Sequence, residues 1–171
     1  MYFYSGASNA REAYDEASYC ISLIRDYQIT YPVAFDWELD GDYDSVTEAC
    51  ETFCNVISSY GYQPMVYSNR NRWYNNFDGE KIASKYKVWM AAYFGKFYYD
   101  SVRWTYGDDL PNFRYHYDMW QYSSRCYVDG ISGQVDVDIA FFGYANYHVD
   151  TKDAVLTVTL SLIHISEPTR P

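Results

Sequence analysis

The sequence predicts an α/β fold in which parallel strands alternate with helices. Short apolar runs alternate with segments of 3.6-residue periodicity at close spacing, which is typical of consecutive βα units. The runs are continuously apolar rather than alternating, as expected for a parallel sheet that is covered on both faces. With 171 residues, the chain is long enough for one domain with a sizeable core.

The N-terminal part of the chain supplies two strand–helix pairs. Strands are predicted at Tyr2–Ser5 and at residues 31–38. Helices are expected to begin at Asn9 and Ser45, because a glutamate follows each of them three positions later, as in a capping box. Gly61 is expected to end the second helix. The apolar helix faces hold Ala13, Ala17, Cys20, Ile21, Ile24 and Tyr27, then Val46, Ala49, Cys50, Phe53, Ile57 and Tyr60.

Four further strands are predicted in the rest of the chain. They lie at residues 64–68, 86–93, 117–123 and 133–137. A loop-and-helix region follows the first of them through Trp73, Asp78 and Ile82, and a turn region lies at residues 108–112.

Two acids close the strand at residues 31–38. Asp36 and Glu38 are two positions apart, so their side chains point to the same face with Cα atoms ~6–7 Å apart. Glycoside hydrolysis requires such a pair, with one carboxyl protonated and the other ionised. The alternative is that the two acids simply lie at a solvated strand end and have no catalytic role. Active sites of (β/α) barrels lie at the carboxyl ends of the strands, where this chain carries Tyr67, Asn69, Tyr93, Gln121, Tyr122, Asp136 and Asp138.

Composition excludes several classes of partner. The net charge of −10 and the pI near 4.5 disfavour nucleic acid and anionic membrane surfaces. No run reaches the ~18 apolar residues of a membrane span, and no signal peptide is visible. The cysteines form no CxxC pair and lie near no His, so we expect no metal site and no cofactor. We expect Cys50 and Cys54 to be buried on one helix face, and a Cys20 link to either stays open.

Aromatic residues make up 21% of the chain, with 22 Tyr. This richness suits a protein that offers flat amphipathic rings to a polar ligand such as a sugar. It equally suits strands that Tyr fills, because Tyr is favoured in strands.

Six segments in order carry a resemblance to a known family. They are YFYSGASNAREAYDEA, YPVAFDWE, GYQPMVYSN, KVWMAAY, DMWQYSS and GISGQVDVD. From Tyr2 to Tyr144 the chain resembles the family 25 glycoside hydrolases, which are lysozyme-type N-acetylmuramidases. The resemblance implies an α/β, TIM-like (β/α) barrel of eight strands. It also implies cleavage of the β-1,4 bond between N-acetylmuramic acid and N-acetylglucosamine in peptidoglycan.

The resemblance also implies roles for individual residues. Glu38 matches the general acid, whose pKa must be raised by burial or by the charge of Asp36. Asp36 matches its partner carboxylate and is expected to stay ionised, and Asp136 matches a further active-site acid. Retention, inversion and participation by the substrate's acetamido group all stay open. The sugar groove is expected to be lined by Tyr67, Trp89, Tyr93 and Gln121.

The chain departs from the family at its start. Family members carry another active-site Asp on the first strand, followed by a second βα unit, and nothing here matches either. Residues 1–159 are also short for a barrel, which usually needs ~200 residues. We therefore expect an incomplete barrel that lacks the first one or two βα units, and an inactive fragment.

The expected domain organisation has three parts. Residues 1–148 form a partial catalytic domain, and residues 149–159 form a linker or the start of a following segment. Residues 160–171 (LSLIHISEPTRP) resemble a translated sequencing-library adapter, which would leave His164 without function. An ordinary linker is the alternative for this tail.

Two other functions compete with the muramidase. A chitinase-like barrel also places Asp and Glu two apart, but further acids and a glycine precede them there, whereas residues 31–35 are YPVAF here. The other is a catalytically dead carbohydrate-binding barrel. The expected partner is the peptidoglycan glycan strand, bound by a monomer. Because this substrate lies outside the cytoplasmic membrane, we expect a secreted protein or a phage lysin.

Overall fold

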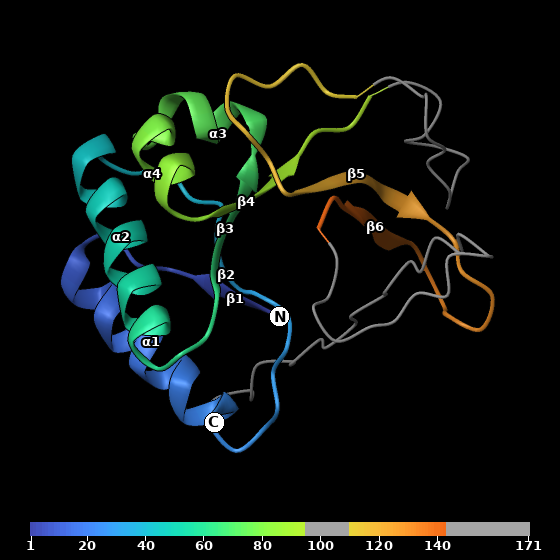
Figure 1. Cartoon of the computed structure of the whole chain (residues 1–171). Helices are drawn as coiled ribbons and strands as arrows, with labels where there is room; N and C mark the ends of the chain where they lie inside the picture. The colour runs from blue at the N-terminus through green and yellow to red at the C-terminus, as the bar shows by residue number, and fades with distance from the viewer. Residues whose placement is uncertain (95–109, 143–171) are drawn as a thin grey trace, which may run out of the picture.

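The computed structural model describes residues 1–94 and 110–142, and its six strands form a single curled sheet (Figure 1). The strands follow one another in space in the order β1-β2-β3-β4-β5-β6. Neighbouring strands are parallel from β1 to β5, which confirms the predicted βα units. The strands are β1 Tyr2–Ser5, β2 Val33–Trp37, β3 Pro64–Asn69, β4 Lys87–Ala91, β5 Met119–Cys126 and β6 Val135–Ala140.

The last strand runs antiparallel to its neighbour, which differs from the parallel arrangement that the sequence suggested. The reason is the length of the connection. Residues 127–134 join β5 to β6, whereas a parallel crossover needs a dozen or more residues. Gly130 and Gly133 adopt positive φ angles of 89° and 97° in this connection, as a tight reversal requires.

Among the described residues, four helices connect the first four strands. They are α1 Ala10–Ile24, α2 Tyr43–Ser59, α3 Arg70–Asn75 and α4 Gly79–Lys85. The predicted cap at Asn9 is confirmed, because its side chain accepts from the Glu12 amide at 3.1 Å. The predicted start at Ser45 is wrong. Asp42 caps α2 by accepting from the Ser45 amide at 3.1 Å, so the helix begins at Tyr43.

The two faces of the sheet differ in what covers them. Figure 1 shows the helices gathered on one side of the sheet. On that side the main core packs the inner faces of α1 and α2 against strand residues such as Phe35, Val66 and Trp120. The opposite face carries a smaller apolar cluster of Ala34, Met65, Tyr67 and Ala91, bordered by Trp89, Met119 and Phe142.

The structure also bears on the expectations for the cysteines, for a membrane span and for the C-terminal segments. The four cysteines are buried and free, so no link joins Cys20 to Cys50 or Cys54. No helix among the described residues has both the length and the apolarity to cross a membrane. The expected turn at 108–112 lies partly, and the expected segments 149–159 and 160–171 lie entirely, outside the described residues.

Candidate active site

Strand register brings the predicted site residues onto one face of the sheet. Asp36 of β2 pairs with Tyr67 of β3, which pairs with Trp89 of β4. Paired residues of neighbouring strands share a face. Two residues further along, Ala91 pairs with Gln121, which pairs with Asp138 of β6. This shared face is the one opposite the helices, as the apolar cluster around Tyr67 shows.

Trp37 fixes the end of β2 from the other side. Its side chain is fully buried in the main core, and its indole Nε1 donates to the Ala7 carbonyl at 3.1 Å. Its own carbonyl accepts from the Ser68 hydroxyl at 2.7 Å. Because side chains alternate along a strand, burying Trp37 toward the helices turns Asp36 toward the opposite face.

Asp36 is a buried carboxyl with neighbouring acids. Only 7% of the residue is exposed, and its Oδ1 has no hydrogen-bond partner among the described residues. Burial, together with the charges of Glu38 and Asp136, raises the pKa of Asp36 to about 8. This direction runs against the expectation that Asp36 stays ionised, because it favours the protonated carboxyl in the unliganded protein.

Glu38 and Asp136 complete the group of acids. Glu38 directly follows β2 and is half-buried, while Asp136 lies near the start of β6 and is exposed at its surface. Partial burial of its carboxyl raises the pKa of Asp136 above its ordinary range. Both acids are close enough to Asp36 for their charges to raise its pKa. The three predicted catalytic residues are thus brought together.

Gln121 joins two of the predicted sugar-binding tyrosines. The Tyr67 hydroxyl donates to Gln121 Oε1 at 2.8 Å, and the Tyr93 hydroxyl donates to the same oxygen. Burial raises the pKa of Tyr93 to about 12, so the hydroxyl keeps the proton that it donates. Gln121 is buried at the centre, whereas Tyr93 is 40% exposed and borders the solvent.

Trp89 lies beside Tyr67 and contacts Asp138, an acid that the sequence places at a strand end without a role of its own. Its indole Nε1 donates to Asp138 Oδ1 at 2.7 Å. Burial, with a smaller contribution from the charge of Asp136, outweighs the hydrogen bond from Trp89 and raises the pKa of Asp138 to about 7. Its spacing of two residues from Asp136 on a strand puts both acids on one face, but it does not indicate Trp89 as the partner of Asp138.

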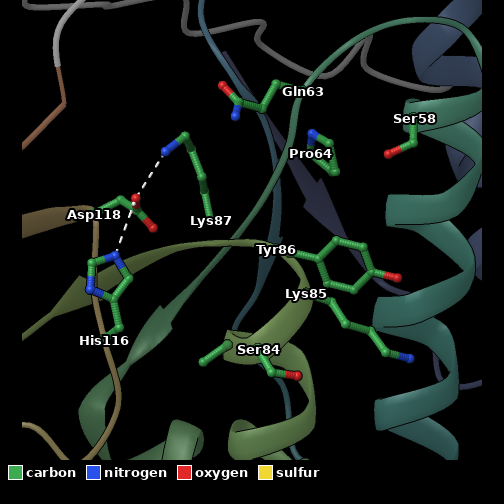
Figure 2. Close-up of a pocket in the computed structure, with 10 residues that line it drawn as sticks. Ser58, Gln63, Pro64, Ser84, Lys85, Tyr86, Lys87, His116 and Asp118 are labelled. Atoms are coloured by element: carbon green, nitrogen blue, oxygen red, sulfur yellow. Dashed lines mark hydrogen bonds and ion pairs between the residues drawn. The ribbon is translucent and has the colours of Figure 1, made fainter.

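A pocket of about 340 Å³ lies away from these acids, at the amino ends of the strands (Figure 2). Pro64 and Lys87 begin β3 and β4 there, and Asp118 precedes β5. Lys87 Nζ contacts Asp118 Oδ1 at 2.9 Å, and His116 Nε2 lies 3.4 Å from the same oxygen. The described part of the chain contains no cluster of His, Cys, Asp and Glu that could hold a metal ion.

Comparison with known proteins places this geometry in a family. The model of the glycosyl hydrolases of family 25 matches residues 1–131. The lysozyme of Streptococcus phage Cp-1 is 31% identical over 123 residues, which is 67% of this chain and 32% of that protein. The D-alanyl-L-alanine endopeptidase of Streptococcus phage B30 is 29% identical over 128 residues, 72% of this chain and 27% of that protein.

A solved structure agrees in fold. The autolysin LytC of Streptococcus pneumoniae, in complex with a synthetic peptidoglycan ligand, superposes with a TM-score of 0.59 at 27% identity. The match covers 80% of this chain and 32% of LytC. The chain thus spans about a third of the length of the relatives that it matches. With the family model matching most of its length, the chain belongs to the glycosyl hydrolases of family 25.

Proposed function

We propose that this chain is catalytic-domain sequence of a lysozyme-type peptidoglycan hydrolase, which cleaves the β-1,4 bond between N-acetylmuramic acid and N-acetylglucosamine. The observation that carries the proposal is the cluster of three acids, Asp36, Glu38 and Asp136, beside a face of aromatic rings. The relatives named a lysozyme and an autolysin with a peptidoglycan ligand support the same substrate.

Glu38 is proposed as the general acid. It is half-buried at the end of β2, where a proton can pass from its carboxyl to the glycosidic oxygen as the bond from that oxygen to the sugar carbon breaks. Positive charge then develops on the sugar, and Asp136 is proposed to stabilise it as a carboxylate. Water then forms the new bond to the sugar carbon, and the proton that it releases restores the protonated carboxyl of Glu38.

Asp36 is proposed as the partner of Glu38 in orienting the sugar. A protonated carboxyl can donate as well as accept a hydrogen bond. Its Oδ1 has no partner among the described residues. A polar sugar substituent is suited to this position, because an unsatisfied buried oxygen gains from a hydrogen bond.

The sugar groove is proposed to be lined by Tyr67, Trp89, Tyr93 and Gln121. Tyr67 and Trp89 pack edge to face with ring centroids 4.6 Å apart, which gives the groove an apolar wall. Tyr93 and Gln121 add polar groups beside it. Such a combination suits a sugar, which has apolar ring faces and polar edges.

The organisation around this site is also part of the proposal. The catalytic domain is placed at residues 1–148, with residues 149–159 as a linker and residues 160–171 as non-native sequence. Because the match to this chain covers only 32% and 27% of the two phage relatives, the six described strands are proposed to belong to a barrel of the family 25 type that contains further strands. A monomeric phage lysin or secreted enzyme fits the phage origin of two relatives.

Peptide cleavage is a weaker candidate. It is the printed activity of the phage B30 relative, of which this chain covers 27%. Nothing in the described residues resembles a metal site that peptide hydrolysis could use. Two carboxylates flanking a sugar bond need no metal ion.

Lysis of purified bacterial walls tests the proposal. Because the six described strands are proposed to belong to a larger barrel, the test uses the enzyme with its complete barrel. Wild type should reduce wall turbidity and release new reducing sugar ends, and Glu38→Gln should lower the rate by about 10²–10⁴-fold. Glu80→Gln, in an exposed first turn of α4, is the matched control and should lyse walls as wild type does. Full activity of Glu38→Gln would refute the assigned acid. Release of free amino groups instead of reducing ends would favour the peptidase, and binding without lysis a carbohydrate-binding protein.

A further inference from the structure

The indole of Trp89 is held by contacts on several sides. Its Nε1 donates to Asp138 Oδ1 at 2.7 Å. Its ring packs edge to face against Tyr67, at 4.6 Å and 60°, and against Tyr2, at 6.3 Å and 67°. The residue is nevertheless only half-buried. A half-buried Trp ring with a fixed orientation can offer its remaining surface to a ligand.

The contact to Asp138 spans a strand. Trp89 pairs in register with Met119 of β5, and Met119 pairs with Ala140 of β6. Asp138 lies two residues from Ala140 on the same face, so the indole reaches diagonally across β5 to meet it. Asp138 itself pairs in register with Gln121, whose side-chain oxygen accepts a hydrogen bond from the Tyr67 hydroxyl. Asp138 is therefore a neighbour of two predicted sugar-binding residues: it accepts from Trp89 and pairs in register with Gln121.

The chemistry of Asp138 is unusual for a purely structural residue. No positively charged partner pairs with it in the part of the chain that the structure describes, and Asp136 is a neighbouring acid. Burying an unpaired carboxylate costs free energy, which hydrogen bonds must offset. The indole N–H is the hydrogen-bond donor found here, and its bond to Asp138 strengthens as the carboxyl ionises, because a bond to an ionised acceptor is roughly twice as strong as a neutral one.

From this geometry we infer that Asp138 is a positioning residue of the glycan site, whose carboxyl fixes the orientation of the Trp89 ring against which a sugar packs. The inference rests on the proposed function. It assigns Asp138 no contact with the reacting atoms, which belong to Glu38 and its partners. Loss of the acceptor should therefore weaken glycan binding more than it slows the chemical step.

Three substitutions separate the parts of this arrangement. Asp138→Asn keeps an acceptor oxygen of the same shape and removes the charge, whereas Asp138→Leu removes the acceptor. Trp89→Phe keeps an aromatic ring and removes the donor. Exposed Asp129→Asn, in the turn between β5 and β6, is the matched control for losing a carboxylate. Circular dichroism and the melting temperature establish that each variant folds.

The first measurement needs no activity. The chain has five Trp residues, so Trp89→Phe identifies the Trp89 indole N–H resonance in a ¹⁵N-labelled sample. The wild-type resonance should lie downfield and exchange slowly with water. In Asp138→Leu it should move upfield and exchange faster, while Asp138→Asn should lie between the two. An unchanged resonance in Asp138→Leu would overturn the inference. If Asp138→Leu does not fold, the position of the Asp138→Asn resonance decides the same point.

The second measurement concerns glycan strands. Asp138→Leu should raise KM for soluble glycan strands about tenfold with a much smaller change in kcat, and Asp138→Asn should recover most of the loss. In the Trp89→Phe background the same change should have no further effect, because the donor is already absent. Additive losses would overturn the inference and point to direct contact between Asp138 and the sugar.

The outcomes distinguish the inference from the proposed function. If wild-type chain neither binds nor cleaves glycan strands, the proposed function fails and the role of Asp138 toward a sugar fails with it. The indole resonance still decides whether Asp138 orients Trp89. If wild type cleaves glycan and the Asp138 variants keep its KM, only the further inference is refuted.

Discussion

The hydroxyls of Tyr67 and Tyr93 share one acceptor, the side-chain oxygen of Gln121. Tyr67 is 7% exposed, so it cannot replace this bond by one to water, whereas Tyr93 is 40% exposed. The three residues come from β3, from the segment after β4, and from β5. Gln121 thus holds together a face of the sheet that is not covered by helices.

We predict that Gln121→Leu lowers the free energy of unfolding by about 1–3 kcal/mol, because the buried Tyr67 hydroxyl loses its acceptor. Urea unfolding measures this change. Adding Tyr67→Phe to Gln121→Leu should recover part of the loss, since no unpaired hydroxyl then stays buried. Adding Tyr93→Phe instead should recover less. Equal recovery by both would contradict the difference in burial.

Asp36 should make stability depend on pH. Its pKa is about 8 in the folded chain against an ordinary 3.8, so the folded state binds more protons between these values. Stability should therefore fall as pH rises from about 4 to about 8. Asp36→Asn should remove this dependence of the unfolding free energy on pH and should stabilise the chain at pH 9 by roughly a few kcal/mol.

Urea unfolding of wild type and Asp36→Asn across pH 4–9 checks this prediction. Exposed Asp129→Asn is the control for the loss of a carboxylate. A wild-type slope that persists in Asp36→Asn would show that another group releases the proton.

Ser68 should be required for the position of the acids on β2. Its hydroxyl donates to the buried Trp37 carbonyl at 2.7 Å, between Asp36 and Glu38 in the chain. Ser68→Ala should cost about 1–3 kcal/mol of unfolding free energy, because that carbonyl loses its side-chain partner. It should also lower lytic activity. Ser84→Ala removes an exposed hydroxyl that bonds within α4, and it should change neither quantity measurably.

The ion pair between Lys87 and Asp118, at the amino ends of the strands, should affect stability without affecting lysis. Burial raises the pKa of Asp118, but the hydrogen bonds from Lys87 and the Val88 amide outweigh it and leave that pKa below its ordinary value. The stabilisation is present above the ordinary Asp pKa and is lost as pH falls through the folded value. Figure 2 shows the contact between Lys87 and Asp118.

Asp118→Asn should therefore lower the unfolding free energy by about 1–2 kcal/mol at pH 7 and by less at pH 3. Denaturation at both pH values measures the effect, and wall turbidity measures lysis. Reduced lysis at pH 7 by a fully folded Asp118→Asn would show that the pocket communicates with the acids.

The elements that the sequence predicts well are those with a local chemical cause. The Asn9 cap and the alternation around Trp37 follow from neighbours in the chain, and both are confirmed. Ser45 misleads because Asp42, three residues earlier, already caps the helix: its carboxyl accepts from both the amide and the hydroxyl of Ser45. The proton on Asp36 could not be predicted from spacing, since it depends on how deeply the fold buries the carboxyl.

The hydrogen-bond partner of Asp138 could not be predicted from the sequence either. Its spacing from Asp136 places it on the shared face, but its bond to Trp89 joins residues 49 positions apart. That contact exists only once β5 lies between β4 and β6 in the observed register. The chain alone gave no reason to prefer Trp89 as its partner.

The reversal of β6 gives the acids of this site two different origins. Asp36 and Glu38 stand where a parallel strand finishes, whereas Asp136 stands where an antiparallel strand starts. The position of Asp136 along the sheet is consequently set by a hairpin of eight connecting residues, 127–134, and by no helix. Lengthening or shortening that hairpin would shift Asp136 along the sheet relative to Asp36 and Glu38. It would also move Val135, Val137 and Ile139, which β6 contributes to the helix-covered core, so the spacing of the charges and the packing of the core are set together.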